Sequence, residues 1–231
     1  IEQVLGGPSH GQGNEAADLV NAKLILLWGS NVTESNLQNW HFVADSLENG
    51  GKLIAIDPLF TIAASRADVF VPVRPGSDTA LALAMMNTII TSELYDRRFL
   101  IDHTVAPFLV REDNGLFLRE KDILQGASDK YVVWDEAANQ PRPFDTSGIS
   151  SALAGAYKVN GIQSSTAFEL LSRLTQQYSP EKSKGITGVS ENTVEMVARE
   201  YATRKPATIY WGFGLDTVSY THLRAHETVL D

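Results

Sequence analysis

Residues 23–35 read KLILLWGSNVTES, and the prediction of the fold begins from this stretch. Leu24–Trp28 is a continuous apolar run, which is typical of a strand buried on both faces of a parallel sheet. Gly29 ends the run, and a short polar loop follows. We expect a helix to begin near Ser35, because Ser35 and Gln38 have the spacing of a capping box. The stretch therefore predicts a strand, a loop and a helix, an arrangement with which α/β sheets present ligands.

The residues that follow complete a βαβ unit. Four apolar residues at helical spacing predict one buried helix face: Leu37, Trp40, Ala44 and Leu47. Residues 49–51, NGG, end this helix, since glycine readily forms the left-handed cap. Lys52–Asp57 is the second predicted strand, and Pro58 closes it. The crossover between the two strands should be right-handed.

Two further strands extend the predicted sheet. Val69–Val73 is followed by a tight turn and by a nearly all-apolar helix over Thr79–Thr91, which we expect to be buried on most sides, with its methionines in the core. Ala207–Trp211 is a later strand that ends in Trp-Gly, as the first strand does. If this strand lies beside the first, the strand order is 3-2-1-4. The two Trp-Gly corners then flank the crevice where ligands of open α/β sheets bind.

The remaining segments predict helices and an insertion. Tyr95–His103 reads as a short helix, while Thr166 and Ser190 are placed to cap two later ones. Between them, residues 107–165 lose regular periodicity, and we interpret them as an irregular insertion with hairpins of its own. The predicted fold class is α/β, a Rossmann-like parallel sheet flanked by helices, over residues 1–216 with the insertion inside it.

Composition excludes several classes of protein. The chain has 231 residues, 43% of them hydrophobic, with a formal net charge of −9 and a pI near 5.0. Clustered basic residues are needed to bind nucleic acid, so no nucleic-acid partner is predicted. No apolar run approaches the ~20 residues of a membrane span, so direct insertion into a membrane is not expected. The absence of Cys excludes disulfides and Cys-ligated zinc or iron–sulfur clusters within these residues.

Four predicted strand ends carry loops on one edge of the sheet: Trp28–Ser35, Asp57–Thr61, Pro75–Asp78 and Trp211–Gly214. Their glycines allow backbone N–H groups to approach an anion, and Ser30, Asn31 and Ser35 could add side-chain donors to phosphate oxygens. Asp57 stands where a Rossmann-type acid accepts from ribose hydroxyls. Asp78 could accept paired donors from a purine, and guanine offers adjacent N1–H and exocyclic NH₂ groups.

Turns and helix caps need the same residue types, so each loop alone supports only a nucleotide-sized crevice. No GxGxxG follows the first strand, which disfavours a nicotinamide or flavin enzyme of unrelated lineage.

Five segments in order resemble the dimethyl sulfoxide reductase family of molybdopterin oxidoreductases: WGSN with ES at 28–35, IDP at 56–58 with Thr61, VRPGSD at 73–78 with the helix after it, ITGVS at 186–190 and YWGFG at 210–214. The resemblance implies that this domain holds one of two molybdopterin guanine dinucleotides, which carry molybdenum or tungsten. The implied cofactor-binding residues are Trp28, Gly29, Ser30, Asn31, Glu34, Ser35, Asp57, Pro58, Thr61, Pro75, Gly76, Ser77, Asp78, Trp211, Gly212, Phe213 and Gly214.

The same resemblance implies two-electron chemistry on a small-molecule substrate, namely oxygen-atom transfer, hydroxylation or its reverse, and it implies a partner, an iron–sulfur electron-transfer subunit. The chain starts at Ile1, and we expect a 4Fe–4S cluster and the protein ligand of the metal to precede that residue. No catalytic or metal-ligating residue is assigned within the chain, which alone should be inactive. The compartment, periplasm or cytoplasm, is not assigned. The alternative is a cofactor-free structural subunit of the same fold in a respiratory complex.

The end of the chain departs from the family pattern. Residues 217–231 resemble the translation of a sequencing adapter and are left out of the fold prediction. His222 and His226 within them stand at the i, i+4 spacing of a helical metal site, but no metal site is assigned there.

Overall fold

The structure is a computed structural model that describes residues 15–212 and Leu215. The described residues form two compact units. The sheet unit comprises the residues up to Ile89 together with those from Pro180 onward, and the hairpin unit comprises Ile90–Ser179. The predicted tail, residues 217–231, lies outside the described residues.

The sheet unit is built on four parallel strands: β1 (Leu24–Trp28), β2 (Lys52–Asp57), β3 (Val69–Pro72) and β9 (Ala207–Trp211). Their order is β3-β2-β1-β9, which confirms the predicted order. In the register, Trp28 lies opposite Ile56 on one side and Trp211 on the other. All the residues of β1 are buried, as an unbroken apolar run predicts for a central strand with both faces covered.

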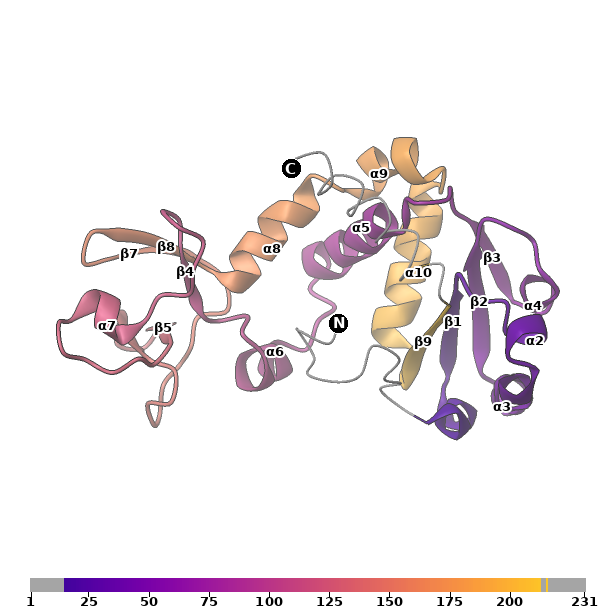
Figure 1. The fold of residues 1–231 in the computed structure, drawn as a ribbon, viewed down its shortest axis with the longest axis horizontal. Helices are drawn as coiled ribbons and strands as arrows, with labels where there is room; N and C mark the ends of the chain where they lie inside the picture. Colours follow the sequence, from indigo (N-terminus) through magenta and orange to yellow (C-terminus); the bar gives the residue numbers. More distant parts are fainter. Residues whose placement is uncertain (1–14, 213–214, 216–231) are drawn as a thin grey trace, which may run out of the picture. The chain divides into compact units, whose positions relative to one another are not determined.

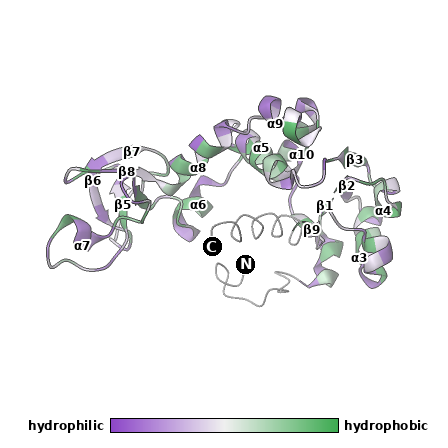
Figure 2. Cartoon of the chain, turned by 45° about the horizontal axis from the view of Figure 1, so that its top comes forward, coloured by the Kyte–Doolittle hydropathy of each residue, from purple (hydrophilic) through white to green (hydrophobic). Residues whose placement is uncertain are grey.

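Helices cover both faces of this sheet (Figure 1). Leu24, Leu26 and Trp28 point to one face and pack with α5 (Asp78–Thr91) and α10 (Glu191–Thr203). Ile25 and Leu27 point to the other face, because side chains alternate along a strand. Three short or medium elements cover that second face: η1 (Ala16–Asn21), α3 (Leu37–Glu48) and α4 (Ile62–Ser65). The helices carry hydrophobic and hydrophilic residues together, as expected for helices with one buried face (Figure 2).

Two predicted helix caps are confirmed. The Ser190 hydroxyl accepts from the Thr193 N–H (3.2 Å) at the start of α10, and the Thr166 hydroxyl accepts from the Glu169 N–H (3.1 Å) at the start of α8. Local spacing was sufficient here, since each cap involves residues three positions apart. The helices α2 (Val32–Ser35), α4 and α9 (Pro180–Thr187) were not predicted.

The long helix after β1 begins within two residues of the predicted start, but the predicted capping box at Ser35 is not formed. Ser35 is the last residue of α2, and its hydroxyl donates to the Asn31 carbonyl (2.8 Å) instead of capping a helix. The next helix, α3, begins at Leu37, behind Asn36. The Asn36 amide donates to the Tyr210 hydroxyl (2.8 Å), so a tertiary contact on β9 replaces the local cap.

The predicted apolar face of α3 was partly wrong. Leu37 is 64% exposed, and Val43 is the fully buried apolar residue of the helix, with Trp40 and Leu47 packed beside it. In α5, Met85 is in the core as predicted, whereas Met86 is exposed. Both errors arise because the sequence shows which residues are apolar but not which flank of a helix the sheet covers.

The hairpin unit contains two small antiparallel sheets. Strands β4 (Leu109–Arg111), β8 (Ile162–Thr166) and β7 (Ala156–Val159) form one, and β5 (Val132–Asp135) pairs with β6 (Gln140–Pro143). Three helices belong to the same unit: α6 (Arg97–His103), α7 (Glu120–Ile123) and α8 (Ala167–Gln176). The hairpins predicted within residues 107–165 are present, and the compact unit extends beyond that segment on both sides.

In the part of the chain that the structure describes, no helix combines the length and apolar character that crossing a membrane would need.

The two Trp-Gly corners touch each other. Gly29 has a φ of +57° and donates its N–H to the Ile56 carbonyl (2.8 Å). The Gly212 N–H donates to the Trp28 carbonyl (3.1 Å), which continues the pairing of β1 and β9 into the loops. A Cβ on Gly212 would overlap the Gly29 carbonyl oxygen. Glycine at position 212 is therefore required by the close approach of two backbones.

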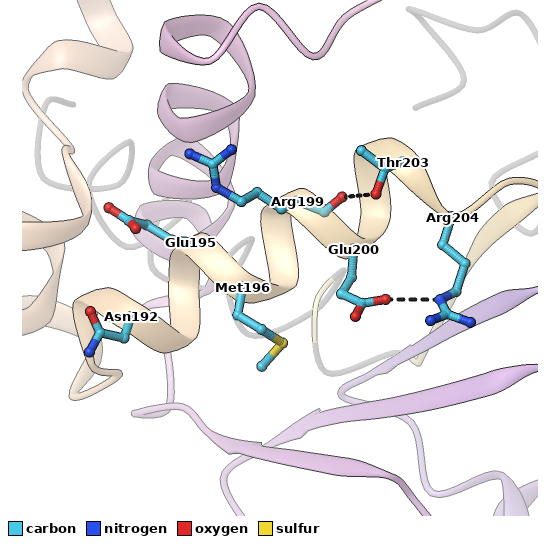
Figure 3. A pocket seen from close by; sticks show the side chains of 7 residues that line it. All are labelled: Asn192, Glu195, Met196, Arg199, Glu200, Thr203 and Arg204. Carbon is cyan, nitrogen blue, oxygen red and sulfur yellow. Dashed lines mark hydrogen bonds and ion pairs between the residues drawn. The ribbon is translucent and has the colours of Figure 1, made fainter.

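At the opposite edge of the sheet an ion pair joins β2 to α10. The Lys52 ammonium lies 2.8 Å from the Glu200 carboxylate, which also accepts from Arg204 (2.9 Å; Figure 3). The hydrogen bond from Lys52, followed by that from Arg204, lowers the pKa of Glu200 below its usual value. Because this carboxyl is charged more readily in the folded chain, it stabilises the fold above its unfolded pKa and loses that effect as the pH falls through its folded pKa.

We therefore expect Glu200→Gln to lower the free energy of unfolding by about 1 kcal/mol at neutral pH. The difference from wild type should be smaller at pH ~3, which lies below the ordinary pKa of glutamate. Urea unfolding of both proteins at the two pH values measures this. Glu195→Gln, on the same helix, is the matched control and should show little effect. A Glu200→Gln difference of equal size at both pH values would contradict a charge-dependent effect.

The contact of the two corners predicts that Gly212→Ala destabilises the chain by about 2 kcal/mol, the usual range for forced overpacking. Gly185→Ala is the control, because a Cβ there would meet nothing within 4 Å and the residue lies in helix α9. That variant should be neutral or more stable by up to about 1 kcal/mol. Thermal and urea unfolding of both variants provide the comparison, and equal stabilities would contradict the close approach.

Candidate functional site

The candidate site is the edge of the sheet at the carboxyl ends of the four strands. Because the strands are parallel, the loops after β1, β2, β3 and β9 all leave the sheet at this edge. The structure therefore brings together the predicted residues from Trp28 to Gly212. Phe213 and Gly214, which were also predicted, lie outside the described residues. The hairpin unit contains none of the predicted site residues.

The loop after β1 is braced by its own side chains. The Asn31 amide donates to Glu34 (2.7 Å) and accepts from the Thr33 hydroxyl (2.9 Å), while the Ser35 hydroxyl donates to the Asn31 carbonyl. The predicted side-chain donors Asn31 and Ser35 thus already have acceptors within the loop. Among the described residues, no acceptor is found for the backbone N–H groups of residues 30–33. The predicted donor Ser30 makes no side-chain hydrogen bond with the described residues, so backbone N–H groups and the Ser30 hydroxyl are the donors that this loop could offer to an anion.

The loop after β2 contains an aspartate turn and a helix cap. Asp57 Oδ1 accepts from the Leu59 N–H (2.8 Å), and its Oδ2 accepts no hydrogen bond from the described residues. The Thr61 hydroxyl accepts from the Ala64 N–H (3.1 Å) and caps α4, while Pro58 is exposed. One carboxylate oxygen of Asp57 is therefore available to a ligand, whereas the Thr61 hydroxyl oxygen already accepts a hydrogen bond from the helix N-terminus.

The loop after β3 is linked to the first loop. Asp78, the first residue of α5, accepts through Oδ1 from the Trp28 indole Nε1–H at 2.8 Å. Oδ2 of Asp78 accepts no hydrogen bond from the described residues. Ser77 is buried, and its hydroxyl donates to the Arg74 carbonyl (2.7 Å), while Pro75 and Gly76 are exposed. The turn thus presents an exposed backbone and one open carboxylate oxygen.

Arg74 anchors this loop and was missed by the sequence analysis. Its backbone N–H donates to the Thr187 carbonyl (2.9 Å), and its Nη1 donates to the Gly185 carbonyl (2.5 Å). Both acceptors are in the last turn of α9, where free carbonyls favour a cation. The signal in the sequence was the basic residue directly before the Pro-Gly turn, but α9 itself was not predicted.

The charge at this edge is mainly negative. Glu34, Asp57 and Asp78 contribute carboxylates, whereas Arg74, the single basic residue of the described loops, is engaged by α9. Such an edge would hold an anion through backbone N–H groups and helix ends, and would use its carboxylates for hydroxyl and N–H donors. Within residues 15–212, no group of three or more His, Cys, Asp or Glu side chains is arranged to hold a metal ion.

A separate hollow of about 660 Å³ runs along α10 (Figure 3). It is lined by residues of both charges on that helix and at its end: Asn192, Glu195, Met196, Arg199, Glu200, Thr203 and Arg204. Two of these form the ion pair between Glu200 and Arg204, and none belongs to the four loops. The open carboxylate oxygens and the unpaired N–H groups are at the loops, so the loops form the better candidate site.

The family described as molybdopterin oxidoreductase matches residues 6–215. The alpha subunit of perchlorate reductase from Dechloromonas aromatica is 35% identical to this chain. The match covers 87% of this chain and 26% of that relative. The putative catalytic subunit of a dimethyl sulfoxide reductase from Halobacterium salinarum is also 35% identical, over 91% of the chain and 25% of the relative. The chain thus spans about a quarter of the length of these relatives.

A solved structure has the same fold. Acetylene hydratase from Pelobacter acetylenicus superposes on 87% of this chain and 21% of its own, with a TM-score of 0.53. At 23% sequence identity, this likeness shows the fold alone. The match to residues 6–215 and the relatives at 35% identity show that the chain belongs to the molybdopterin oxidoreductase family.

Proposed function

We propose that this chain is the part of a molybdenum- or tungsten-dependent oxidoreductase that holds one molybdopterin guanine dinucleotide at the four strand-end loops. The observation that carries the proposal is the complementary set of groups at one edge. Among the described residues, backbone N–H groups without an acceptor lie in the first loop, and carboxylate oxygens that accept no hydrogen bond lie on Asp57 and Asp78 in the next two loops. A dinucleotide needs both kinds of group, since its phosphates accept hydrogen bonds and its sugar and base donate them.

Each loop has a separate role in this proposal. The N–H groups of residues 30–33 bind phosphate oxygens, and the exposed backbone of Gly76 allows close approach of the ligand. Asp57 accepts from ribose hydroxyls through Oδ2. Asp78 accepts from guanine N1–H and from the exocyclic amine. Trp211 is half-exposed at the end of β9, and we propose that it covers one side of the bound nucleotide.

The metal carried by the bound cofactor would supply two-electron chemistry, such as oxygen-atom transfer or hydroxylation. The residues of this chain bind and orient the nucleotide end, and none of them is assigned to the reacting atoms. The relatives are named as alpha or catalytic subunits, so we propose that the longer protein works with an iron–sulfur electron-transfer subunit on a small-molecule substrate. A 4Fe–4S cluster in another part of that protein completes the proposed electron path.

A cofactor-free structural subunit is the second candidate. One observation favours it, namely that the side chains of Asn31, Ser35 and Thr61 make local hydrogen bonds and need no ligand. The same bonds would also prepare a loop for a ligand, so metal content is the measurement that separates the candidates.

We expect the holoprotein that contains this chain to carry about one molybdenum or tungsten per polypeptide, because its metal would be held through the pterin cofactor. Elemental analysis of the purified protein measures the metal. Nucleotide released by mild acid hydrolysis should be GMP. A protein with neither metal nor releasable GMP would support the structural subunit instead.

The base assignment predicts that the full chain binds GDP more tightly than IDP by about tenfold, since IDP lacks the exocyclic amine and loses one hydrogen bond to a carboxylate. Asp78→Asn should weaken GDP binding by at least about tenfold and remove the preference for GDP, because the amide offers one acceptor in place of two. Calorimetric titration with both nucleotides measures these affinities.

Asp57→Asn is the control for this experiment. It should weaken GDP and IDP equally, because both nucleotides have the same ribose. If Asp78→Asn retained the full preference for GDP, the assignment of Asp78 to guanine would be wrong.

A further inference from the structure

We infer that Trp28 is the positioning residue for Asp78, and that its buried indole fixes the carboxylate that reads the base. The inference rests on the proposed function and changes the role of one residue in it. The family resemblance implied that Trp28 is one of the cofactor-binding residues. In the structure Trp28 is 5% exposed, so its ring is almost fully covered by protein. Trp28 would therefore influence the ligand indirectly, through the hydrogen bond that its Nε1 donates to Asp78 Oδ1.

The donor is held rigidly. Trp28 is the last residue of β1 and is paired in register with Ile56 on β2 and Trp211 on β9. Its ring packs in the core between the sheet and the helices α5 and α10. Both the backbone and the ring are therefore fixed by packing that does not depend on a ligand.

The acceptor would be mobile without this bond. Asp78 is only partly buried, and the terminal torsion of an aspartate has a broad energy well, so the carboxylate plane could rotate. A hydrogen bond from a fixed indole removes that freedom at Oδ1. Oδ1 keeps a second lone pair and Oδ2 keeps both of its own, so two neighbouring acceptors are presented in one set plane. This is the pattern that paired N–H donors of a guanine edge require.

The backbone of the same turn is fixed at its other end. Arg74 is bonded to Thr187 and Gly185 at the end of α9, and Ser77 is bonded back to the Arg74 carbonyl. The turn between Arg74 and Asp78 is thus held on one side by α9 and on the other by Trp28. Such preorganisation lowers the cost of ordering the loop when a ligand binds.

A different reading of the contact is purely structural. Buried tryptophan N–H groups usually find an acceptor, and Asp78 could serve only to satisfy Trp28. The two readings differ in what they predict for base recognition. Loss of the N–H would lower stability in both cases, but only positioning would reduce the discrimination between GDP and IDP.

The test uses the full chain with Trp28→Phe, which keeps an apolar ring and removes the donor. Titrations with GDP and IDP, and thermal unfolding without nucleotide, are measured for each variant. We expect the ratio of GDP to IDP affinity to fall at least about threefold, since a freely rotating carboxylate pairs less well with two donors. Trp40→Phe is the matched control, because Trp40 lies on α3 and packs in the other cluster of the sheet unit. It should leave the ratio unchanged.

A second variant separates recognition from folding. Benzothienylalanine at position 28 retains the shape of tryptophan and lacks the N–H, so it should fold and still show the lower ratio. In the Asp78→Asn background, Trp28→Phe should cause no further change in the ratio, because the two residues act through one hydrogen bond.

The outcomes distinguish this inference from the proposed function. If Asp78→Asn removes the preference for GDP while both changes at position 28 leave it intact, the positioning role of Trp28 is overturned and the guanine assignment stands. If the wild-type chain binds GDP and IDP equally, the guanine assignment is overturned, and the inference about Trp28 fails with it.

Discussion

The pairing of β1 with parallel strands on both of its sides is the constraint on which the candidate site depends. This pairing places Trp28 beside Trp211, although the two residues are far apart in the sequence. Because these strands are parallel, the loops that follow β1, β2 and β9 all begin at the same edge of the sheet. The cost of ordering so many residues is met by the burial of β1 under helices on both faces. A site made of four loops can exist here because one strand is central and fully buried.

The elements that could be predicted from the sequence are those set by local rules. Leu24–Trp28 is apolar throughout, so its burial on both faces followed directly, and the strand order followed from the two Trp-Gly corners. The cap at Ser190 needs only residues within one helical turn. The spacing at Ser35 was equally favourable, but the predicted cap does not form. Asn36 instead donates to Tyr210 on β9, a partner that cannot be inferred from neighbouring residues.

At the candidate site, too, features set by neighbouring residues could be predicted, whereas contacts between residues distant in the sequence could not. The positions of the loops follow from the strand ends, and the proposal that Asp57 and Asp78 accept from a ligand came from their places on those loops. Their hydrogen-bond partners could not be named. The bond between Trp28 and Asp78 joins residues 50 positions apart, and Arg74 binds carbonyls more than 100 positions away, in a helix that the sequence analysis missed. Side-chain roles at this edge depend on the folded arrangement of several loops.

The bonding within the loops also decides which groups can give specificity. Asn31 and Ser35 are occupied by bonds inside the first loop, and Arg74 is occupied by α9. What they leave for a phosphate in the first loop is backbone N–H and the Ser30 hydroxyl, and neither kind of donor selects a base. The side chains with open acceptors in the described loops include Asp57, whose proposed partner is a ribose common to all nucleotides, and Asp78. Under the proposed function, discrimination between bases falls to Asp78, and we infer that its precision is set by the buried Trp28 that donates to it.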